Sequence, residues 1–319
     1  MYDAIIIGGG PGGLTAGIYA ARANMKTLLI RSTFKASLIT TTDIIENYPG
    51  FPEGIGGFEL VERFREQALR FGITIMDDDI SSVVKTSVGG KEGWQVNTSL
   101  TQYKGLSLII ATGTEYAHLG VPGEAEFTGR GVSYCATCDG PFYRDGKLAV
   151  VGGGDTAVQE ALFLTRFARS VTIVHRRDTL RAAGVLKDKA FSNEKISFEF
   201  SSVVEEIIGD SAVRSIRLKG VREEGKKKTL DVDGVFIFTG NIPNTKAFQG
   251  VTTMDEKGYI IVDSHMMTSA PGIFACGDCT AKLLRQVVTA CGDGATAAFA
   301  AYEYVSKLKG TSYEGLKRV

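Results

Sequence analysis

The sequence has few of the features that mark secreted or membrane proteins. Its 319 residues include only five cysteines, unlike the dense disulfide frameworks of small secreted domains. No uninterrupted apolar run approaches the roughly 18 residues that cross a bilayer. No basic segment with a cleavage site precedes the first apolar run, Ala4 to Ile7. We therefore expect a cytoplasmic protein without a membrane span, in which any disulfide is catalytic rather than structural.

The chain also lacks an excess of charge of either sign. Lys plus Arg and Asp plus Glu number 36 each, so the formal net charge is zero. Without a basic field to attract a phosphate backbone, we expect no nucleic-acid partner. The composition, 44% hydrophobic and 23% charged, is that of a globular chain long enough for two domains.

Glycine is abundant at one early turn. The apolar run Tyr2 to Gly8 reads as a strand, and Leu14 to Ala23 and Lys26 to Ile30 read as a helix and a second strand. The turn between the first strand and the helix has the dinucleotide-binding spacing Gly8-x-Gly10-x-x-Gly13, with Pro11 inside it. A helix that begins at such a turn presents N–H groups and its positive dipole end to a pyrophosphate.

The same pattern recurs about 144 residues later. A strand from Lys147 to Val151 leads into Gly152-Gly153-Gly154-Asp155-Thr156-Ala157, a helix to about Phe167 and a strand from Val171 to Val174. Each unit is followed far downstream by a buried strand that ends in Thr-Gly, at Thr112-Gly113 and at Thr239-Gly240. One such turn is weak evidence, but two in the same context predict two dinucleotide sites.

These repeats predict an α/β fold of two Rossmann-like domains with three-layer ββα architecture, the second inserted into the first. The expected boundaries are 1–114 for the first part of the first dinucleotide-binding domain, 115–244 for the inserted second domain and 245–319 for the rest of the first. Two hinge strands are expected at Thr114 to Tyr116 and Asn244 to Ala247. The other expected elements are a helix Phe58–Arg70, a meander from Ile80 to Tyr103, a strand Leu106–Ala111, a second meander from Val203 to Leu230 with a solvated basic turn at Lys226 to Lys228, strands Gly258–Val262 and Ile273–Cys276, and a helix from about Arg285 to Leu308.

Basic residues follow the second strand of the second unit. His175, Arg176 and Arg177, with Arg181 one turn later, stand where an NAD site usually has an acid. Guanidinium groups suit a 2′-phosphate, so NADPH is favoured over NADH. Arg31 occupies the same position in the first unit, so this rule does not decide its ligand. A flavin is favoured there because a nicotinamide hydride needs a two-electron carrier before it can reduce a disulfide.

The second predicted domain contains Cys135-Ala136-Thr137-Cys138, followed by Asp139. A C-x-x-C pair lowers the pKa of one thiol and allows thiol–disulfide exchange. Cys276 and Cys279 form a second such pair, so a Cys₄ zinc site is a competing interpretation. We expect Cys276, Cys279 and Cys291 to be core or cofactor-lining thiols, and His118 and His265 to be structural or surface residues.

The motifs together resemble the low-molecular-weight thioredoxin reductases, over essentially the whole chain and in the same order. They are the Gly8–Gly13 turn, Glu46-Asn47-Tyr48-Pro49-Gly50, Ala111-Thr112-Gly113, Cys135-Ala136-Thr137-Cys138-Asp139-Gly140, the Gly152–Ala157 turn, His175-Arg176-Arg177 with Arg181, and Gly277-Asp278 with Arg285-Gln286.

This resemblance implies a homodimeric enzyme that passes electrons from NADPH through FAD to thioredoxin. Cys138 is expected to face the flavin and bond to it transiently, Cys135 to attack thioredoxin, and Asp139 to manage protons. The expected FAD residues are Gly8, Gly10, Pro11, Gly13, Asn47, Thr112, Gly113, Gly277, Asp278, Arg285 and Gln286. The expected NADPH residues are Gly152, Gly154, Asp155, Thr156, Ala157, His175, Arg176, Arg177 and Arg181.

The chain departs from the family pattern at two places. Many members have Gly-Gly-Gln-Leu where this chain has Lys35-Ala36-Ser37-Leu38-Ile39, and some have an acid in place of Arg31. Two other functions stay open. One is the same fold with NADH or a reduced ferredoxin or flavodoxin as donor, and the His-Arg-Arg run argues against the donors without nicotinamide. The other is a non-catalytic regulator that binds flavin or zinc.

Overall fold

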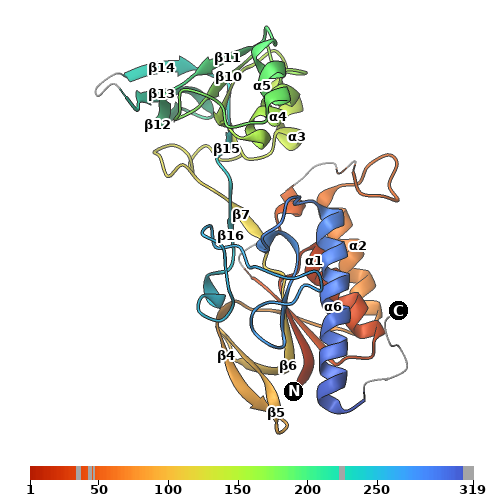
Figure 1. Ribbon diagram of the computed structural model, residues 1–319. Coiled ribbons are helices and arrows are strands. Elements are labelled where there is room, and N and C mark those ends of the chain that lie inside the picture. The colour runs from red at the N-terminus through yellow and green to blue at the C-terminus, as the bar shows by residue number, and fades with distance from the viewer. Residues whose placement is uncertain (34–36, 42–44, 46, 223–226, 312–319) are drawn as a thin grey trace. The chain divides into compact units, whose positions relative to one another are not determined.

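The computed structural model describes residues 1–33, 37–41, 45, 47–222 and 227–311, except the side chains of Thr41, Thr137 and Cys138. The chain divides into two compact units. Unit 1 comprises Met1–Glu115 and Ile242–Val319, and unit 2 comprises Tyr116–Asn241. Both the red N-terminal strands and the blue C-terminal helix α6 therefore belong to unit 1 (Figure 1).

Unit 1 is built on one branched sheet. Its strands are β1 (Tyr2–Ile7), β2 (Thr27–Arg31), β3 (Thr74–Asp77), β4 (Ile80–Val88), β5 (Lys91–Thr98), β6 (Gln102–Ile110) and β17 (Ile273–Ala275), and its helices are α1 (Pro11–Arg22), α2 (Gly57–Arg70), α6 (Val287–Lys309) and the short 3-10 turns η1 (Leu38–Thr41), η3 (Lys246–Phe248) and η4 (Gly277–Cys279). Strands β3, β2, β1 and β6 are parallel neighbours. The first half of β6 then pairs with β5 antiparallel, and its second half pairs with β17 parallel.

Alternation along the parallel strands divides the core of unit 1 into two layers. Ile6 and Leu29 point to the face covered by α1, α2 and α6. Ile5 and Leu28 point to the opposite face, where β4 and β5 pack together with Phe248. Because successive side chains of a strand point to opposite faces, each hydrophobic strand serves both layers.

Unit 2 repeats this plan. Its strands are β8 (Val132–Ser133), β9 (Lys147–Gly152), β10 (Ser170–Val174), β11 (Ile196–Glu199), β12 (Ser202–Gly209), β13 (Val213–Gly220), β14 (Lys227–Asp231) and β15 (Gly234–Phe238), with helices α3 (Ala136–Asp139), α4 (Asp155–Leu164) and α5 (Gly184–Phe191) and the 3-10 turn η2 (Gly140–Tyr143). The parallel order is β11-β10-β9-β15-β8. Helices α4 and α5 contribute to the core on one face, and the antiparallel sheet β12-β13-β14 packs on the other. The expected α/β class with two parallel, Rossmann-like sheets is confirmed.

The chain passes between the units at two short strands, β7 (Thr114–Tyr116) and β16 (Asn241–Pro243), which pair with each other. We expected the second crossing at Asn244 to Ala247, which is wrong. Asn244 donates its backbone N–H to Gly113 O, and Phe248 at the end of η3 is fully buried in unit 1. A segment anchored by a core phenylalanine belongs to the body of its unit.

Three other expected elements differ in the structure. The meander and the strand Leu106–Ala111 were expected to be separate, but β6 is continuous through Gly105, which pairs with both Tyr2 and Trp94. Gly258 to Val262 is not a strand; Ile260 makes only isolated bridges to Met254 and Thr280 among the described residues. Gly258 has φ +86, which breaks an extended run.

The prediction of a solvated basic turn at Lys226 to Lys228 is also wrong for the two lysines that the structure describes. Lys227 and Lys228 lie in β14 and form ion pairs with Glu205 and Glu199, whereas Lys226 lies outside the described residues. The last helix begins at Val287 rather than Arg285, because Gln286 has an extended backbone and caps it. Within the described residues, no helix is long and apolar enough to cross a membrane.

Candidate functional site

The first glycine turn closes β1 tightly onto the end of β6. Gly8 has φ +118, and a Cβ there would lie 2.1 Å from Ala111 O. A Cβ at Gly13 would lie 1.9 Å from Gly8 O, so Gly13 brings α1 close to the strand. Gly10 is the N-cap of α1 without a side-chain cap among the described residues, and Pro11 starts the helix. The helix start is therefore left for ligand oxygens.

The second glycine turn has the same construction. A Cβ at Gly152 would lie 2.5 Å from Phe238 O and 2.6 Å from Ala157 Cβ. Gly154 is the N-cap of α4, and a Cβ there would meet no described atom within 4 Å. Asp155 and Thr156 are exposed in the first turn of α4. Each turn thus packs on the carbonyl that precedes a Thr-Gly pair. Gly154 is open in the second turn, whereas a Cβ at Gly10 in the first turn would lie 3.1 Å from Ser37 Oγ.

His175 and the three arginines separate into a buried and an exposed group. His175 is 4% exposed, and a Cβ at Gly153 would lie 2.4 Å from its ring. Its Nε2 has no partner among the described residues, and burial, with Arg181, Arg177 and Arg176 nearby, lowers its pKa. Arg176, Arg177 and Arg181 are exposed. The structure therefore places His175 beneath the turn and leaves the guanidinium groups accessible to an anion.

Arg181 is held against the second turn by the backbone. Its N–H donates to Gly153 O over 2.6 Å, and Ala183 N donates to Asp155 Oδ1 over 2.7 Å. Asp155 therefore connects the start of α4 with the segment that carries Arg181.

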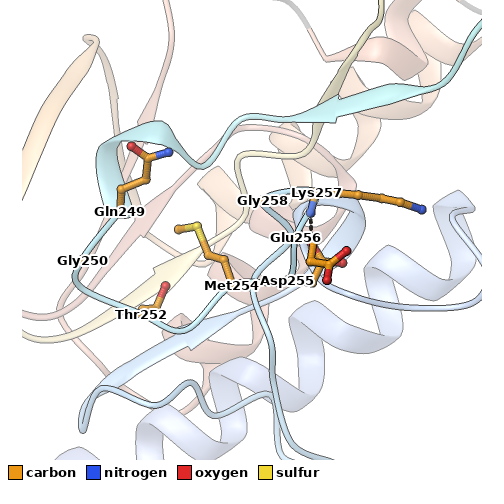
Figure 2. Close-up of a pocket in the computed structure, with 8 residues that line it drawn as sticks. All are labelled: Gln249, Gly250, Thr252, Met254, Asp255, Glu256, Lys257 and Gly258. Carbon is orange, nitrogen blue, oxygen red and sulfur yellow. Dashed lines mark hydrogen bonds between the residues drawn. The ribbon is translucent and has the colours of Figure 1, made fainter.

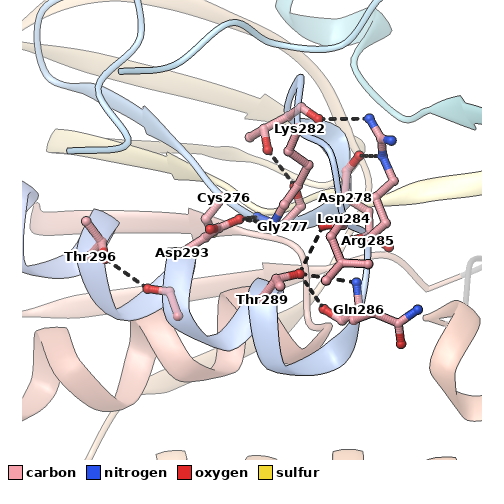
Figure 3. Close-up of polar contacts among 12 residues, drawn as sticks. Cys276, Gly277, Asp278, Lys282, Leu284, Arg285, Gln286, Thr289, Asp293 and Thr296 are labelled. Carbon is pink, nitrogen blue, oxygen red and sulfur yellow. Dashed lines mark hydrogen bonds and ion pairs between the residues drawn. The ribbon is translucent and has the colours of Figure 1, made fainter. Parts of the chain in front are cut away.

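Unit 1 carries a polar cluster between η4 and the start of α6 (Figure 3). The Asp293 carboxylate accepts the N–H of Gly277 at 3.0 Å and pairs with Lys282, and both charged side chains are largely buried. Arg285 donates to Asp278 O at 3.3 Å and to Thr280 O at 3.1 Å, and lies 4.1 Å from the centre of the Tyr259 ring. These contacts fix the backbone around Asp278.

The side chain of Asp278 is the unsatisfied group of this cluster. Its Oδ1 is buried without a partner among the described residues, and desolvation raises its pKa. A buried carboxylate oxygen without a donor is costly unless a ligand supplies one. A ligand hydroxyl fits this position, whereas a phosphate would repel the carboxylate.

Asn47 and Gln286 meet at the beginning of α6. Asn47 Nδ2 donates to Gln286 Oε1 over 2.9 Å. Gln286 also forms a capping box with Thr289, which Figure 3 shows at the helix start. Two residues 239 positions apart in sequence are thus brought together in unit 1.

The C-x-x-C segment lies in unit 2 at the short helix α3. Cys135 is half-buried and disulfide-bonded. Its backbone is held by Ser133, whose hydroxyl accepts from Cys135 N at 3.1 Å, and Asp139 N donates to Cys135 O at 3.2 Å. The side chain of Cys138 lies outside the described part of the structure, so its pairing with Cys135 stays a prediction.

Sequence reasoning missed the polar network beside Cys135. The Tyr134 hydroxyl donates to Glu124 Oε1 at 2.7 Å and lies 2.7 Å from His118 Nδ1. Its ring stacks on Tyr116 with centroids 5.4 Å apart. His118, expected to be a structural or surface residue, is an exposed residue that takes part in this network. The sequence signal was only a tyrosine directly before a cysteine, with no spacing that points to Glu124.

The three other cysteines are free. Cys276 and Cys279 are fully buried, and burial raises the pKa of both, that of Cys279 to about 11. Such thiols are poor nucleophiles. Among the described residues, no group of His, Cys, Asp or Glu is arranged to hold a metal ion.

A pocket of about 490 Å³ lies apart from these residues (Figure 2). It is lined only by one stretch of unit 1, between Gln249 and Gly258, and by none of the predicted site residues. Asp255 stabilises this loop by accepting from Lys257 N at 2.9 Å. We assign no ligand to it.

Comparison with known proteins agrees with this geometry. Residues 2–294 match the family described as pyridine nucleotide-disulphide oxidoreductase. A thioredoxin reductase of Listeria innocua is 48% identical over 310 residues, 97% of this chain and 95% of the relative. One from Bacillus subtilis is 46% identical over 312 residues, 98% of this chain and 97% of the relative.

Solved structures give the same result. The Lactococcus lactis thioredoxin reductase in its FR conformation matches with a TM-score of 0.77 and 43% identity, over 97% of this chain and all of that chain. The family expected from the motifs is therefore confirmed. The chain belongs to the pyridine nucleotide-disulphide oxidoreductases and, within them, to the thioredoxin reductase family.

Proposed function

We propose that this chain is an NADPH-dependent thioredoxin reductase. The observation that carries the proposal is the location of the disulfide-bonded Cys135 in the same unit as a dinucleotide turn with three exposed arginines. A nicotinamide cofactor can reduce a disulfide in the same unit when a two-electron carrier accepts its hydride and passes the electrons on. The first glycine turn, in unit 1, supplies a place for that carrier.

FAD is the cofactor that we assign to unit 1. The uncapped start of α1 at Gly10 and Pro11 suits its pyrophosphate, with Gly8 and Gly13 shaping the turn. Asp278 Oδ1, which has no partner among the described residues, suits a ribityl hydroxyl, and the hydrogen-bonded Asn47 and Gln286 would bind the flavin ring. Thr112, Gly113, Gly277 and Arg285 complete this set. When bound, FAD supplies an acceptor for the hydride of NADPH and a donor of two electrons to a disulfide.

NADPH is the donor that we assign to unit 2. Gly152, Gly154, Asp155, Thr156 and Ala157 form the turn that would hold its pyrophosphate. Arg176, Arg177 and Arg181 would bind the 2′-phosphate through bidentate hydrogen bonds. His175 supports the turn from below rather than meeting the phosphate, because its ring is buried against Gly153.

The thiol chemistry follows from the proposed Cys135–Cys138 pair. Two electrons and one proton convert this disulfide to a Cys135 thiolate and a Cys138 thiol, and Asp139 is the proposed proton donor. The Cys135 thiolate then attacks the thioredoxin disulfide, so that one new S–S bond forms and one thioredoxin sulfur leaves. Cys138 attacks Cys135 in turn, which restores the original disulfide and releases reduced thioredoxin.

Both the nicotinamide and the disulfide belong to unit 2, whereas the flavin belongs to unit 1. We propose that the units rotate about β7 and β16, so that each partner meets the flavin in turn. A homodimer in the cytoplasm, without nucleic acid or membrane, is part of the same proposal; sedimentation velocity tests the dimer.

The test mixes the flavin-loaded protein with NADPH or NADH and thioredoxin and follows nucleotide oxidation. We expect turnover that depends on thioredoxin and prefers NADPH. Cys135→Ser and Cys138→Ser should each abolish it while FAD is still reduced by NADPH. Cys291→Ser, which changes a free cysteine outside the proposed path, should retain it. Absence of thioredoxin-dependent turnover with both nucleotides refutes the proposal.

A further inference from the structure

Arg31 stands at the position that decides how a Rossmann unit treats the adenosine ribose. It is the last residue of β2, where a dinucleotide site ordinarily has an acid that binds the ribose hydroxyls. A Cβ at Gly9 would lie 2.9 Å from Arg31 Cβ and 3.2 Å from its Cδ. The stem of Arg31 therefore lies directly against the glycine turn of unit 1. If only the residue at this strand end counted, the Arg31 guanidinium would attract a 2′-phosphate and unit 1 would favour NADP over FAD.

Asp77 changes this prediction. It is the register partner of Arg31 on β3, and its two carboxylate oxygens accept from Arg31 Nε and, at 3.3 Å, from Nη2. This fork neutralises the guanidinium and fixes its plane. The pair holds the pKa of Asp77 below its ordinary value, so both groups stay charged near neutral pH.

The neighbouring residues add negative charge. Asp79 accepts from the hydroxyls of Ser32 and Thr33, which directly follow Arg31. Asp78 is 2% exposed and accepts from Ser99 at 2.6 Å. This strand end thus combines one guanidinium with three carboxylates, whereas the corresponding end in unit 2 presents exposed Arg176, Arg177 and Arg181.

We propose that Asp77 is a specificity-determining residue of the first dinucleotide site: by neutralising Arg31, it lets unit 1 accept an adenosine with a free 2′-hydroxyl and reject one with a 2′-phosphate. A 2′-phosphate carries nearly two negative charges and would meet an acidic strand end. The inference rests on the proposed function, because it explains why FAD enters unit 1 although NADPH is present.

The test uses apoprotein from which the flavin has been removed. FAD rebinding is followed by flavin fluorescence, and AMP or adenosine 2′,5′-bisphosphate, which differ only by the 2′-phosphate, is added as competitor. Displacement of FAD reports on unit 1 alone, whichever nucleotide also binds unit 2. For the unmodified protein we expect AMP to compete at a concentration about tenfold lower than the bisphosphate.

Asp77→Asn should reduce this preference about fivefold, because it frees the charge of Arg31 at a half-exposed site. Arg31→Gln should retain or increase the preference. Asp210→Asn is the matched control, since it removes the carboxylate of another exposed Asp–Arg pair, with Arg214, and should leave the preference unchanged.

Equal competition by the two nucleotides in the unmodified protein, or an unchanged preference in Asp77→Asn, overturns the inference while thioredoxin turnover stands. Failure of the apoprotein to bind FAD at all overturns the proposed function together with this inference.

Discussion

The hydroxyl of Tyr134, the residue before the disulfide-bonded Cys135, donates a hydrogen bond to Glu124 Oε1 at 2.7 Å. Because this bond uses the only hydroxyl proton, the Tyr134 oxygen can only accept from His118 Nδ1, which lies 2.7 Å away and must carry a proton. Glu124 further accepts the N–H groups of Leu119 and Gly120 at 2.8 and 2.7 Å. One buried carboxylate thus joins the loop 119–124 to the residue that precedes Cys135.

Glu124→Ala should strongly destabilise unit 2. It leaves two backbone N–H groups and a tyrosine hydroxyl without their acceptor, at a site 3% exposed. We expect a loss of about 2–4 kcal/mol in the free energy of unfolding, measured by urea denaturation. Tyr134→Phe keeps the stacked ring and removes the hydrogen bonds to Glu124 and from His118. Because the His118 side chain is exposed, the loss should still be only about 1 kcal/mol. Equal losses for the two variants would contradict this assignment.

Glu124 should also make the fold acid-sensitive. Burial opposes its ionisation, but hydrogen bonds from Leu119, Tyr134 and Gly120 outweigh burial, and its pKa lies below the ordinary 4.5. Its contribution is therefore complete above pH 4.5 and is lost as the pH falls through the folded pKa. The free energy of unfolding, measured by urea denaturation at each pH, should decrease less steeply with falling pH for Glu124→Gln than for the unmodified protein.

His175 should make the free energy of unfolding depend on pH in a separate range, above that of Glu124. Burial, then Arg181, Arg177 and Arg176, lower its pKa below 6.5, so the unfolded chain takes up a proton before the folded one. The free energy of unfolding should decline as the pH falls below 6.5. His175→Gln should flatten this decline, and Arg181→Gln should narrow its window because one cause of the shift is gone. A slope that none of these substitutions changes would exclude His175 as the source.

Two glycines of α6 should respond in opposite ways to alanine. A Cβ at Gly294 would lie 2.2 Å from Gly12 O, where α6 crosses α1, whereas one at Gly292 would meet no described atom within 4 Å. Gly294→Ala should therefore cost about 1–3 kcal/mol or more. Gly292→Ala should stabilise the helix by about 0.5–1 kcal/mol. Thermal unfolding of the two variants makes the comparison, and a stabilised Gly294→Ala would show that the helices can separate.

The ion pair of Lys282 and Asp293 gives a prediction for unit 1. Both side chains are more than four-fifths buried. Asp293→Ala leaves Lys282 and the Gly277 N–H without an acceptor and should cost about 3–5 kcal/mol. Combining Lys282→Met with Asp293→Asn keeps an acceptor for Gly277 and removes the unpaired charge, so it should cost much less. Urea denaturation of the flavin-free protein separates this effect from ligand binding.

The repeated α/β plan was predictable because in each unit an apolar strand, a glycine turn and an amphipathic helix follow one another directly in the sequence. Features that depend on residues far apart in sequence were not. Gly105 looked like a strand end, yet it lies within β6 where Tyr2 and Trp94 approach. The pairing of Arg31 with Asp77 and of Asn47 with Gln286 depends on strand order and helix docking, which no local pattern contains. The roles proposed for residues at the two cofactor sites stay predictions.

The crossing of α1 and α6 also bears on how the chain is made. Unit 2 is formed by one continuous stretch, Tyr116–Asn241, and can complete its sheet while later residues are still being synthesised. Unit 1 cannot, because β17 and α6 come last and α6 packs directly on α1. During synthesis the first 115 residues therefore cannot complete unit 1. The face of α1 that packs on α6 stays exposed until α6 has been synthesised. The half-made chain thus exposes its apolar surface in the unit that begins first and finishes last.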